Sequence, residues 1–346
     1  MAIAPNLREM KLRMAGAILA LALISAGPVA IERFKSAVFT ATTPLARNDQ
    51  LINRLFRPFF SADLAKKNDA ATLSSFPVNP KDETFGLYVP RDGPARGYGL
   101  LIWVSPLDRA GMPPGWPEVL ESRGVIYVTA ARSGNETAPI GRRIPLALIA
   151  AANVMNRFPV NPDRVWISGF SGGARIAERI ALAYPDVFSG AILDGSSDPF
   201  GNAEVPLPPR ELFERLLDRM AFVISTGQRD RYNNRDAKRF LSSLRQHCLT
   251  RVSVEARPRD GHQMMNGSSL GAAIEYLDRP RDPLTPEQRQ CREQLYSKID
   301  RELVLAETMA LEAPGGARAA IRLIDRRYGH LAAPRSLELR ARVGEN

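Results

Sequence analysis

The sequence predicts an α/β fold with a doubly wound, mostly parallel sheet and an appended C-terminal helical hairpin. Between residues 84 and 278, short apolar runs of strand length alternate with longer stretches of helical pattern. This alternation is typical of parallel strands joined by crossover helices. After Pro283 the strand-like runs stop, and residues 285–311 and 317–328 are helical in pattern, with Pro314-Gly315-Gly316 between them.

Seven apolar runs are expected to form the strands. Residues 100–105 (LLIWVS) and 125–130 (VIYVTA) are apolar almost throughout, as expected of strands buried on both faces. The other expected strands are residues 85–89, 165–169, 190–193, 221–225 and 252–256. Helices are expected between them over residues 144–157, 174–184, 236–246 and 270–277.

Composition limits the classes of partner. The chain has 346 residues, of which 45% are hydrophobic, and this is enough for one large α/β core with appendages. Its formal net charge of +10 is spread along the chain without a dense basic block, and aromatic residues make up only 7%. Without zinc-finger spacing or an RNA-binding signature, no nucleic-acid partner is expected.

The N-terminus has the pattern of a targeting segment. Arg8, Lys11 and Arg13 form a basic flank, residues 14–30 carry no charge, and Glu32 ends the apolar run. This pattern predicts either a cleaved signal peptide or an uncleaved membrane anchor, with a buried core helix as the remaining alternative. The protein is therefore expected to be exported, either to the periplasm or held at the membrane by its N-terminus.

Four regions follow from these patterns. Residues 1–35 are the expected signal peptide or anchor, and residues 36–82, with prolines at four positions, are expected to form a linker and an irregular approach to the core. Residues 83–282 form the expected catalytic domain, and residues 283–346 a helical extension that could bind a protein partner.

Gly169-Phe170-Ser171-Gly172-Gly173 matches the G-x-S-x-G pattern of a nucleophilic serine. Its context supports this interpretation, because the motif directly follows an expected strand and directly precedes an expected helix. The sharp turn needs small neighbours, and the amide after the serine, that of Gly172, can donate to an oxyanion. The alternative is an ordinary glycine-rich turn that binds phosphate at a helix N-terminus.

A serine needs a base, and the chain has only three histidines. His247 ends an expected helix, and His330 lies in the basic tail. His262 follows Gly261 in the loop after the last expected strand, which is where an α/β-hydrolase places its base. His262 is therefore the predicted base, with a surface loop histidine as the alternative.

The acid of such a site lies between the serine and the histidine in chain order. Asp230 follows the strand expected at residues 221–225 and could fix the tautomer of the imidazole. Asp194, just past another expected strand, and Asp198 remain rival candidates.

The second oxyanion donor is expected in the loop after residues 100–105, which reads Pro106-Leu107-Asp108-Arg109. The His-Gly pair often found there is missing, and Pro106 has no amide hydrogen to donate. Leu107 is the candidate donor.

The two cysteines, Cys248 and Cys291, could form a disulfide in an oxidising compartment. Such a bond would tie the helical hairpin to the catalytic domain. The alternatives are two independent thiols and a hairpin that docks through its apolar side chains alone, which are Leu303, Val304, Leu305 and Leu311.

Residues 84–278 resemble the polyhydroxybutyrate depolymerase and feruloyl esterase-like branch of the α/β-hydrolases. The nearest phrase is Asn-Pro-Asp-Arg-Val-Trp-Ile-Ser-Gly-Phe-Ser-Gly-Gly over residues 161–173, where the family has a similar D-P-x-R-V lead before the serine. The stretch from Thr226 to Asp230 and the Gly261-His262 pair also look like the acid and base positions of that family. The resemblance implies a triad of Ser171, Asp230 and His262 in an esterase.

The expected activity is that of a serine hydrolase that cleaves a small-molecule or polymeric ester through an acyl-enzyme. No metal or organic cofactor is expected, because no carboxylate or histidine cluster has ligand spacing. A peptidase or amidase with the same triad, and a non-catalytic binding protein on the same fold, are the alternatives.

Overall fold

A computed structural model describes residues 33–344 of the chain. The apolar run at residues 14–30, which the sequence predicts to be a signal peptide or anchor, lies outside the described residues. Within residues 33–344, no helix has the length and apolar character required to cross a membrane.

The centre of the fold is one eight-stranded sheet in the order β1-β2-β4-β3-β5-β6-β7-β8. From β4 to β8 the neighbouring strands are parallel, whereas β2 is antiparallel to both β1 and β4. The strands are β1 (Lys35–Ala37), β2 (Phe85–Tyr88), β3 (Tyr98–Val104), β4 (Val125–Ala130), β5 (Val160–Phe170), β6 (Gly190–Asp194), β7 (Ala221–Gly227) and β8 (Val252–Arg257). The mostly parallel, doubly wound sheet expected from the sequence is therefore present.

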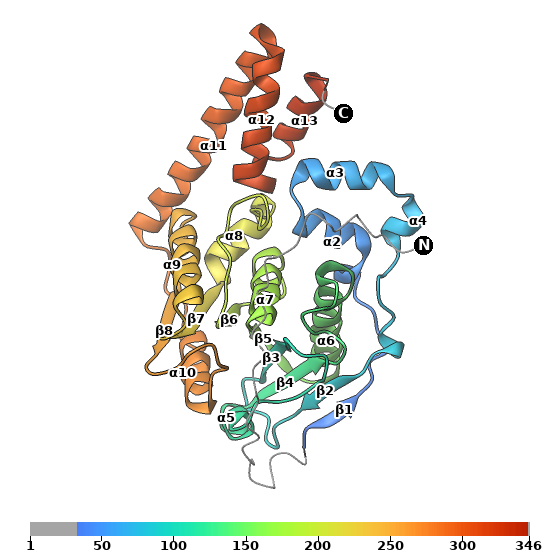
Figure 1. Cartoon of the computed structure of the whole chain (residues 1–346), viewed down its shortest axis with the longest axis vertical. Coiled ribbons are helices and arrows are strands. Elements are labelled where there is room, and N and C mark those ends of the chain that lie inside the picture. Colours follow the sequence, from blue (N-terminus) through green and yellow to red (C-terminus); the bar gives the residue numbers. More distant parts are fainter. Residues whose placement is uncertain (1–32, 345–346) are drawn as a thin grey trace.

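Helices cover both faces of the sheet (Figure 1). The helices are α2 (Asn48–Leu55), α3 (Pro58–Lys67), α4 (Ala70–Ser74), α5 (Trp116–Arg123), α6 (Ile144–Arg157), α7 (Gly172–Ala183), α8 (Arg210–Arg219), α9 (Arg231–Gln246), α10 (Gly267–Leu277), α11 (Pro286–Glu312), α12 (Pro314–Tyr328) and α13 (Arg335–Arg342). Their apolar side chains form two separate cores. Helices α5 and α10 contribute to the smaller one, while α6 to α9 and the terminal helices contribute to the larger one.

Strand β3 shows why its sequence is apolar at nearly every position. Leu100, Ile102 and Val104 point into the larger core, whereas Leu101 and Trp103 point into the smaller one. Side chains alternate between the faces of a strand, so a strand covered on both faces must be apolar at consecutive positions.

The region before β2 differs from the linker that the sequence predicts. Residues 48–74 form the helices α2, α3 and α4, and β1 pairs with β2 at the edge of the sheet. Leu51, Leu55 and Phe59 from this region are buried in the larger core. The prediction of a linker rested on four prolines and is wrong for these helices. Pro44 and Pro58 stand in the first turns of helices, where proline is tolerated.

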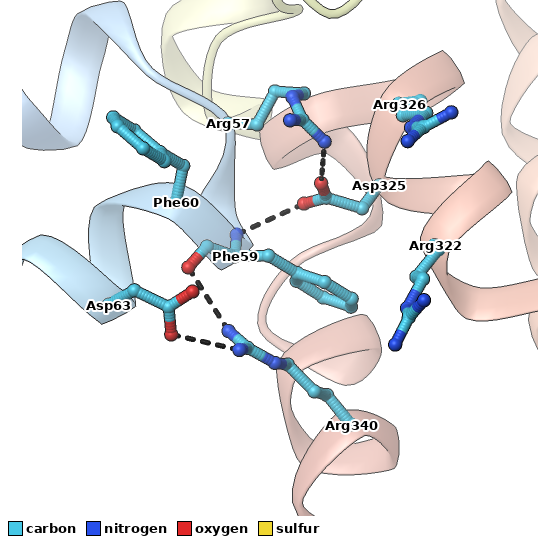
Figure 2. A pocket seen from close by; sticks show the side chains of 8 residues that line it. All are labelled: Arg57, Phe59, Phe60, Asp63, Arg322, Asp325, Arg326 and Arg340. Carbon is cyan, nitrogen blue, oxygen red and sulfur yellow. Dashed lines mark hydrogen bonds and ion pairs between the residues drawn. The ribbon is translucent and has the colours of Figure 1, made fainter. Parts of the chain in front are cut away.

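The N-terminal helices and the C-terminal extension are joined by polar contacts (Figure 2). Asp325 of α12 is fully buried and accepts hydrogen bonds from Arg57 at 2.7 Å and from the backbone amide of Phe59 at 3.1 Å. Arg340 of α13 pairs with Asp63 of α3 at 2.8 Å. Because these residues are more than 260 positions apart, the first and last helices of the described chain stabilise one another.

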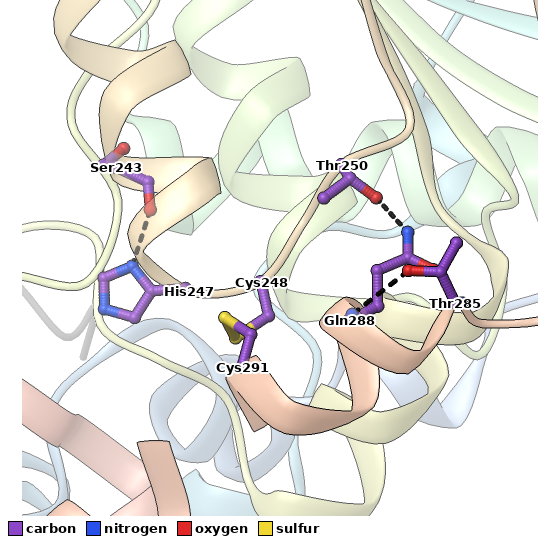
Figure 3. Close-up of a disulfide and its surroundings, with 7 residues drawn as sticks. All are labelled: Ser243, His247, Cys248, Thr250, Thr285, Gln288 and Cys291. Carbon is purple, nitrogen blue, oxygen red and sulfur yellow. Dashed lines mark hydrogen bonds between the residues drawn. A yellow bond between two sulfur atoms is a disulfide. The ribbon is translucent and has the colours of Figure 1, made fainter. Parts of the chain in front are cut away.

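A disulfide fixes the other end of the extension (Figure 3). Cys248, just after α9, is bonded to Cys291 on the first turns of α11, and their Cα atoms are 5.8 Å apart. Gln288 of α11 also donates a hydrogen bond to Thr250. The extension is thus covalently tied to the segment that connects α9 to β8.

The docking face of the helical hairpin includes only one of the four side chains named from the sequence. Leu303 is buried, but Val304, Leu305 and Leu311 are exposed, Leu311 to 87%. Leu303 shares its buried helix face with Ile299 and Ala306. Their spacing of four and three residues places them on one helix face, which the consecutive apolar residues Leu303-Val304-Leu305 do not reveal.

Candidate active site

Ser171 lies on a sharp turn between β5 and α7. Its backbone has φ 54° and ψ −123°, a conformation that costs energy for a residue with a side chain and that is concentrated at functional sites. The turn leaves no room for a side chain at Gly173, because a Cβ there would overlap the backbone carbonyl of Val104. The glycines of the motif therefore allow helix α7 to start directly against the end of β3.

His262 reaches Ser171 from the loop after β8. Its Nε2 lies 2.9 Å from Ser171 Oγ, and its Nδ1 lies 2.6 Å from Asp230 Oδ2. The Asp230 side chain is 7% exposed and that of His262 is 32% exposed. The structure thus brings together the three side chains that the sequence singles out, in the serine, histidine, carboxylate order that proton transfer from the hydroxyl requires.

Packing holds the imidazole in this place. The ring of Phe170, the residue before the serine, stacks on His262 with ring centroids 4.9 Å apart and planes 29° from parallel. Gly195, at φ 72°, lies on the same rings, and a Cβ there would be 2.9 Å from Phe170 and 3.3 Å from His262. The aromatic residue inside G-x-S-x-G therefore helps to position the imidazole of His262.

Asn233 is a site residue that the sequence analysis did not identify. Its Nδ2 donates to Asp230 Oδ2 at 2.7 Å and lies 3.1 Å from His262 Nδ1, while its backbone amide donates to Asp230 Oδ1 at 3.3 Å. Asp230 is the N-cap of α9, and Asn233 is the third residue of that helix. The signal in the sequence is the three-residue spacing of Asp230 and Asn233, because an N-cap side chain accepts a hydrogen bond from the third residue of its helix.

The rival acids have other partners. Asp194 is fully buried and pairs with Arg257 at 2.6 Å, and it accepts a hydrogen bond from the Met265 amide at 2.7 Å. Burial raises the pKa of Asp194 to about 6, while Arg257 acts in the opposite direction. Asp198 pairs with Arg175 at 2.7 Å. Neither carboxylate makes a hydrogen bond to His262 in the described residues.

The other two histidines are engaged by backbone carbonyls. His247 Nδ1 lies 2.8 Å from the carbonyl of Ser243, and His330 Nε2 lies 2.8 Å from that of Phe56. Burial lowers the pKa of each histidine below its ordinary value and so favours the neutral imidazole. Their positions fit a structural role.

Gly172 and Leu107 are the oxyanion donors that the sequence predicts. Gly172 is the first residue of α7, where backbone amides have no partner within the helix. The Leu107 amide, however, donates to Ser105 Oγ at 3.0 Å, two residues earlier. The expected second donor is therefore already engaged within its own loop.

No metal-binding cluster of three or more His, Cys, Asp or Glu side chains occurs in the part of the chain that the structure describes. A cavity of about 260 Å³ between the N-terminal helices and the extension contains none of the three candidate catalytic side chains. It is lined by Arg57, Phe59, Phe60, Asp63, Arg322, Asp325, Arg326 and Arg340.

The strand order, with an antiparallel β2 before a parallel sheet and a serine turn after β5, defines an α/β-hydrolase fold. No protein-family model and no curated protein matches the chain.

Several solved structures resemble parts of the fold. An S-formylglutathione hydrolase from Staphylococcus aureus is 14% identical, with a TM-score of 0.42, over 56% of this chain and 92% of that one. A thermostable esterase is 13% identical, with a TM-score of 0.44, over 78% of this chain and 64% of that one. Dipeptidyl peptidase 4 from Porphyromonas gingivalis is 14% identical, with a TM-score of 0.40, over 56% of this chain, which spans about a third of that protein (33%). With TM-scores below 0.5, these likenesses do not indicate what the chain acts on.

Proposed function

We propose that this protein is a serine hydrolase that cleaves an ester through an acyl-enzyme intermediate. One observation carries the proposal. Ser171 Oγ, His262 and Asp230 form a continuous hydrogen-bonded chain with distances of 2.9 and 2.6 Å, and the serine stands on a strained turn at the start of a helix. This arrangement activates a hydroxyl that is otherwise a weak nucleophile.

In the proposed reaction, Ser171 Oγ bonds to the ester carbonyl carbon while its proton moves to His262 Nε2. The carbonyl electron pair moves to oxygen, and the amide of Gly172 donates to the resulting oxyanion. When the carbonyl re-forms, the bond to the alkoxy group breaks, and the proton on His262 goes to the leaving alcohol. Water then releases the acid by the same steps, with His262 again as the base. Asp230 keeps Nδ1 protonated and stabilises the charged imidazole.

The proposal of an ester substrate rests on the sequence resemblance to polyhydroxybutyrate depolymerases and feruloyl esterases. Within the phrase that carries the resemblance, Arg164 is buried and pairs with Asp278 of the loop after α10 at 2.7 Å. This arginine therefore has a structural role. An amide substrate would use the same triad and differ only in its leaving group.

The test combines a mechanism-based probe with an aryl ester. A fluorophosphonate probe should label the protein, and Ser171→Ala should abolish both labelling and p-nitrophenyl acetate hydrolysis, with a loss on the order of 10⁴-fold or more. Ser168→Ala is the matched control, because this buried hydroxyl on β5 only donates to the Ile192 carbonyl. Unchanged labelling in Ser171→Ala would show that another residue reacts. A protein that neither reacts nor turns over would support the non-catalytic alternative. Faster hydrolysis of matched anilides than of esters would favour an amidase.

We also propose that the chain is exported, to the periplasm or to the membrane surface. The support is the basic and apolar N-terminal sequence together with the disulfide, since such bonds persist mainly in oxidising compartments. Fractionation of the native host, with mass spectrometry of the mature N-terminus, tests this proposal. Full-length protein in the cytoplasmic fraction would contradict it.

A further inference from the structure

Asn135 carries a side-chain amide without a hydrogen-bond partner. It lies in the loop after β4, and its Oδ1 is buried. Neither end of the carboxamide bonds to any residue within 33–344. Buried polar groups are nearly always paired, and an unpaired one costs about 1–3 kcal/mol, so an unpaired carboxamide indicates a role in binding.

This carboxamide lies on the residue that follows the candidate nucleophile. A Cβ placed on Gly172 would be 2.8 Å from Asn135 Cγ and 3.0 Å from Nδ2, and closer still to Oδ1. Gly172 therefore has to be glycine, because the Asn135 side chain fills the space that its own side chain would need. Asn135 is thus next to the amide that donates to the oxyanion.

The backbone of Asn135 is fixed by the loop after β3. Its amide donates to the carbonyl of Pro106 at 3.0 Å, and the neighbouring Gly134 amide donates to Asp108 Oδ1 at 2.8 Å. The same loop is the usual source of the second oxyanion donor, but its Leu107 amide is bonded to Ser105. The loop that should supply the donor instead holds Asn135 against the nucleophile turn.

We propose that the side-chain Nδ2 of Asn135 is the second oxyanion donor, acting with the backbone amide of Gly172. The inference rests on the proposed hydrolase function. In the tetrahedral intermediate, the negative oxygen accepts one hydrogen bond from each group. Rotation about the Cβ–Cγ bond of asparagine directs Nδ2 toward the oxygen without moving the backbone. Such a donor also accounts for the missing His-Gly pair, because the loop after β3 no longer needs to supply an amide.

Two substitutions separate catalysis from packing. Asn135→Ala should lower kcat by about 10²-fold or more and leave KM nearly unchanged, as loss of one oxyanion donor does. Asn135→Asp has the same shape but places a negative charge near the oxyanion, so it should be slower than Asn135→Ala. A purely structural role predicts the opposite order. Thr137→Val is the control in the same loop, and it should retain activity within about threefold, as expected for an exposed hydroxyl that makes one long hydrogen bond.

Inhibitor binding gives an independent measurement. An aryl boronate forms a tetrahedral adduct with an active serine, so its Ki should weaken across Asn135→Ala and Asn135→Asp in parallel with kcat/KM. An Asn135→Asp variant as active as the wild type, or an Asn135→Ala variant within threefold of it, would overturn the inference. Failure of the proposed function is distinguishable, because the wild type itself would then not react with the fluorophosphonate.

Discussion

The disulfide between Cys248 and Cys291 allows a quantitative prediction of stability. The appropriate perturbation is Cys291→Ala, because Cys291 is on a regular helix. Cys248 is less suitable, since its φ of 67° means that any replacement also changes backbone strain. Cys291→Ala removes the covalent link and leaves that backbone unchanged.

The expected magnitude follows from the length of chain that the bond closes. The cysteines are 43 residues apart, and restricting the unfolded chain by a loop of this size contributes about 4 kcal/mol at 25 °C. The link is reinforced by Glu214 of α8, which accepts hydrogen bonds from Arg292 at 2.7 Å and from Tyr296. The extension should therefore stay docked in the variant, and the loss should appear as a lower free energy of unfolding of the whole protein.

Urea unfolding followed by circular dichroism measures this difference, with mass spectrometry to verify the disulfide in the wild type. The variant should unfold at a lower urea concentration, and the melting temperature should fall by about 6 °C, as expected for a loss of about 4 kcal/mol in a chain of this length. Wild-type protein treated with a reducing agent is the control and should match the variant. If oxidised wild type and Cys291→Ala share one urea midpoint, the loop-closure argument is wrong for this chain.

Two further predictions concern polar side chains on α9 and α7. Asn233→Leu should lower kcat/KM by roughly 10- to 100-fold, because the Asp230 carboxylate loses the hydrogen bond that Asn233 donates to it. Asn233→Asp should also move the acidic limb of the pH–activity profile to higher pH, because a second carboxylate stabilises the protonated imidazole. Profiles that coincide with that of the wild type would contradict this role. Burial raises the pKa of Glu178 well above its ordinary value, so the folded chain holds a proton that the unfolded chain releases above about pH 4.5. The free energy of unfolding should therefore fall as the pH rises above about 4.5, and it should fall less steeply in Glu178→Gln. Melting temperatures at pH 5 and pH 8 measure this difference. Glu211→Gln, at an exposed position, is the control, and parallel curves for Glu178→Gln and the wild type would refute the argument.

Some failures of prediction have a common physical cause. The helices of residues 48–74 were missed because their prolines stand at helix starts, and the sequence does not say whether a proline begins a helix or breaks one. The docking face of α11 was misjudged because Val304 and Leu305 are apolar but exposed, and only the position of α12 decides which helix face is covered.

The sequence by itself determined the alternating architecture and the position of Ser171. Both depend on local signals, namely runs of apolar residues and glycines around a serine at a strand–helix junction. Elimination among three histidines also pointed to His262.

Only the tertiary structure decided what the polar groups do. Asp194 and Asp230 both follow strands expected from the sequence. In the structure, however, Asp194 forms an ion pair with Arg257, and Asp230 is the carboxylate that contacts His262. Asn135 carries no local signature in the sequence, and Asn233 carries only its spacing from Asp230. The role proposed for each depends on a contact with a residue 37 or 29 positions away. The physical reason is that a hydrogen bond requires two groups, often far apart in the chain, to lie about 3 Å from each other to within a few tenths of an ångström, whereas sequence patterns report only neighbours.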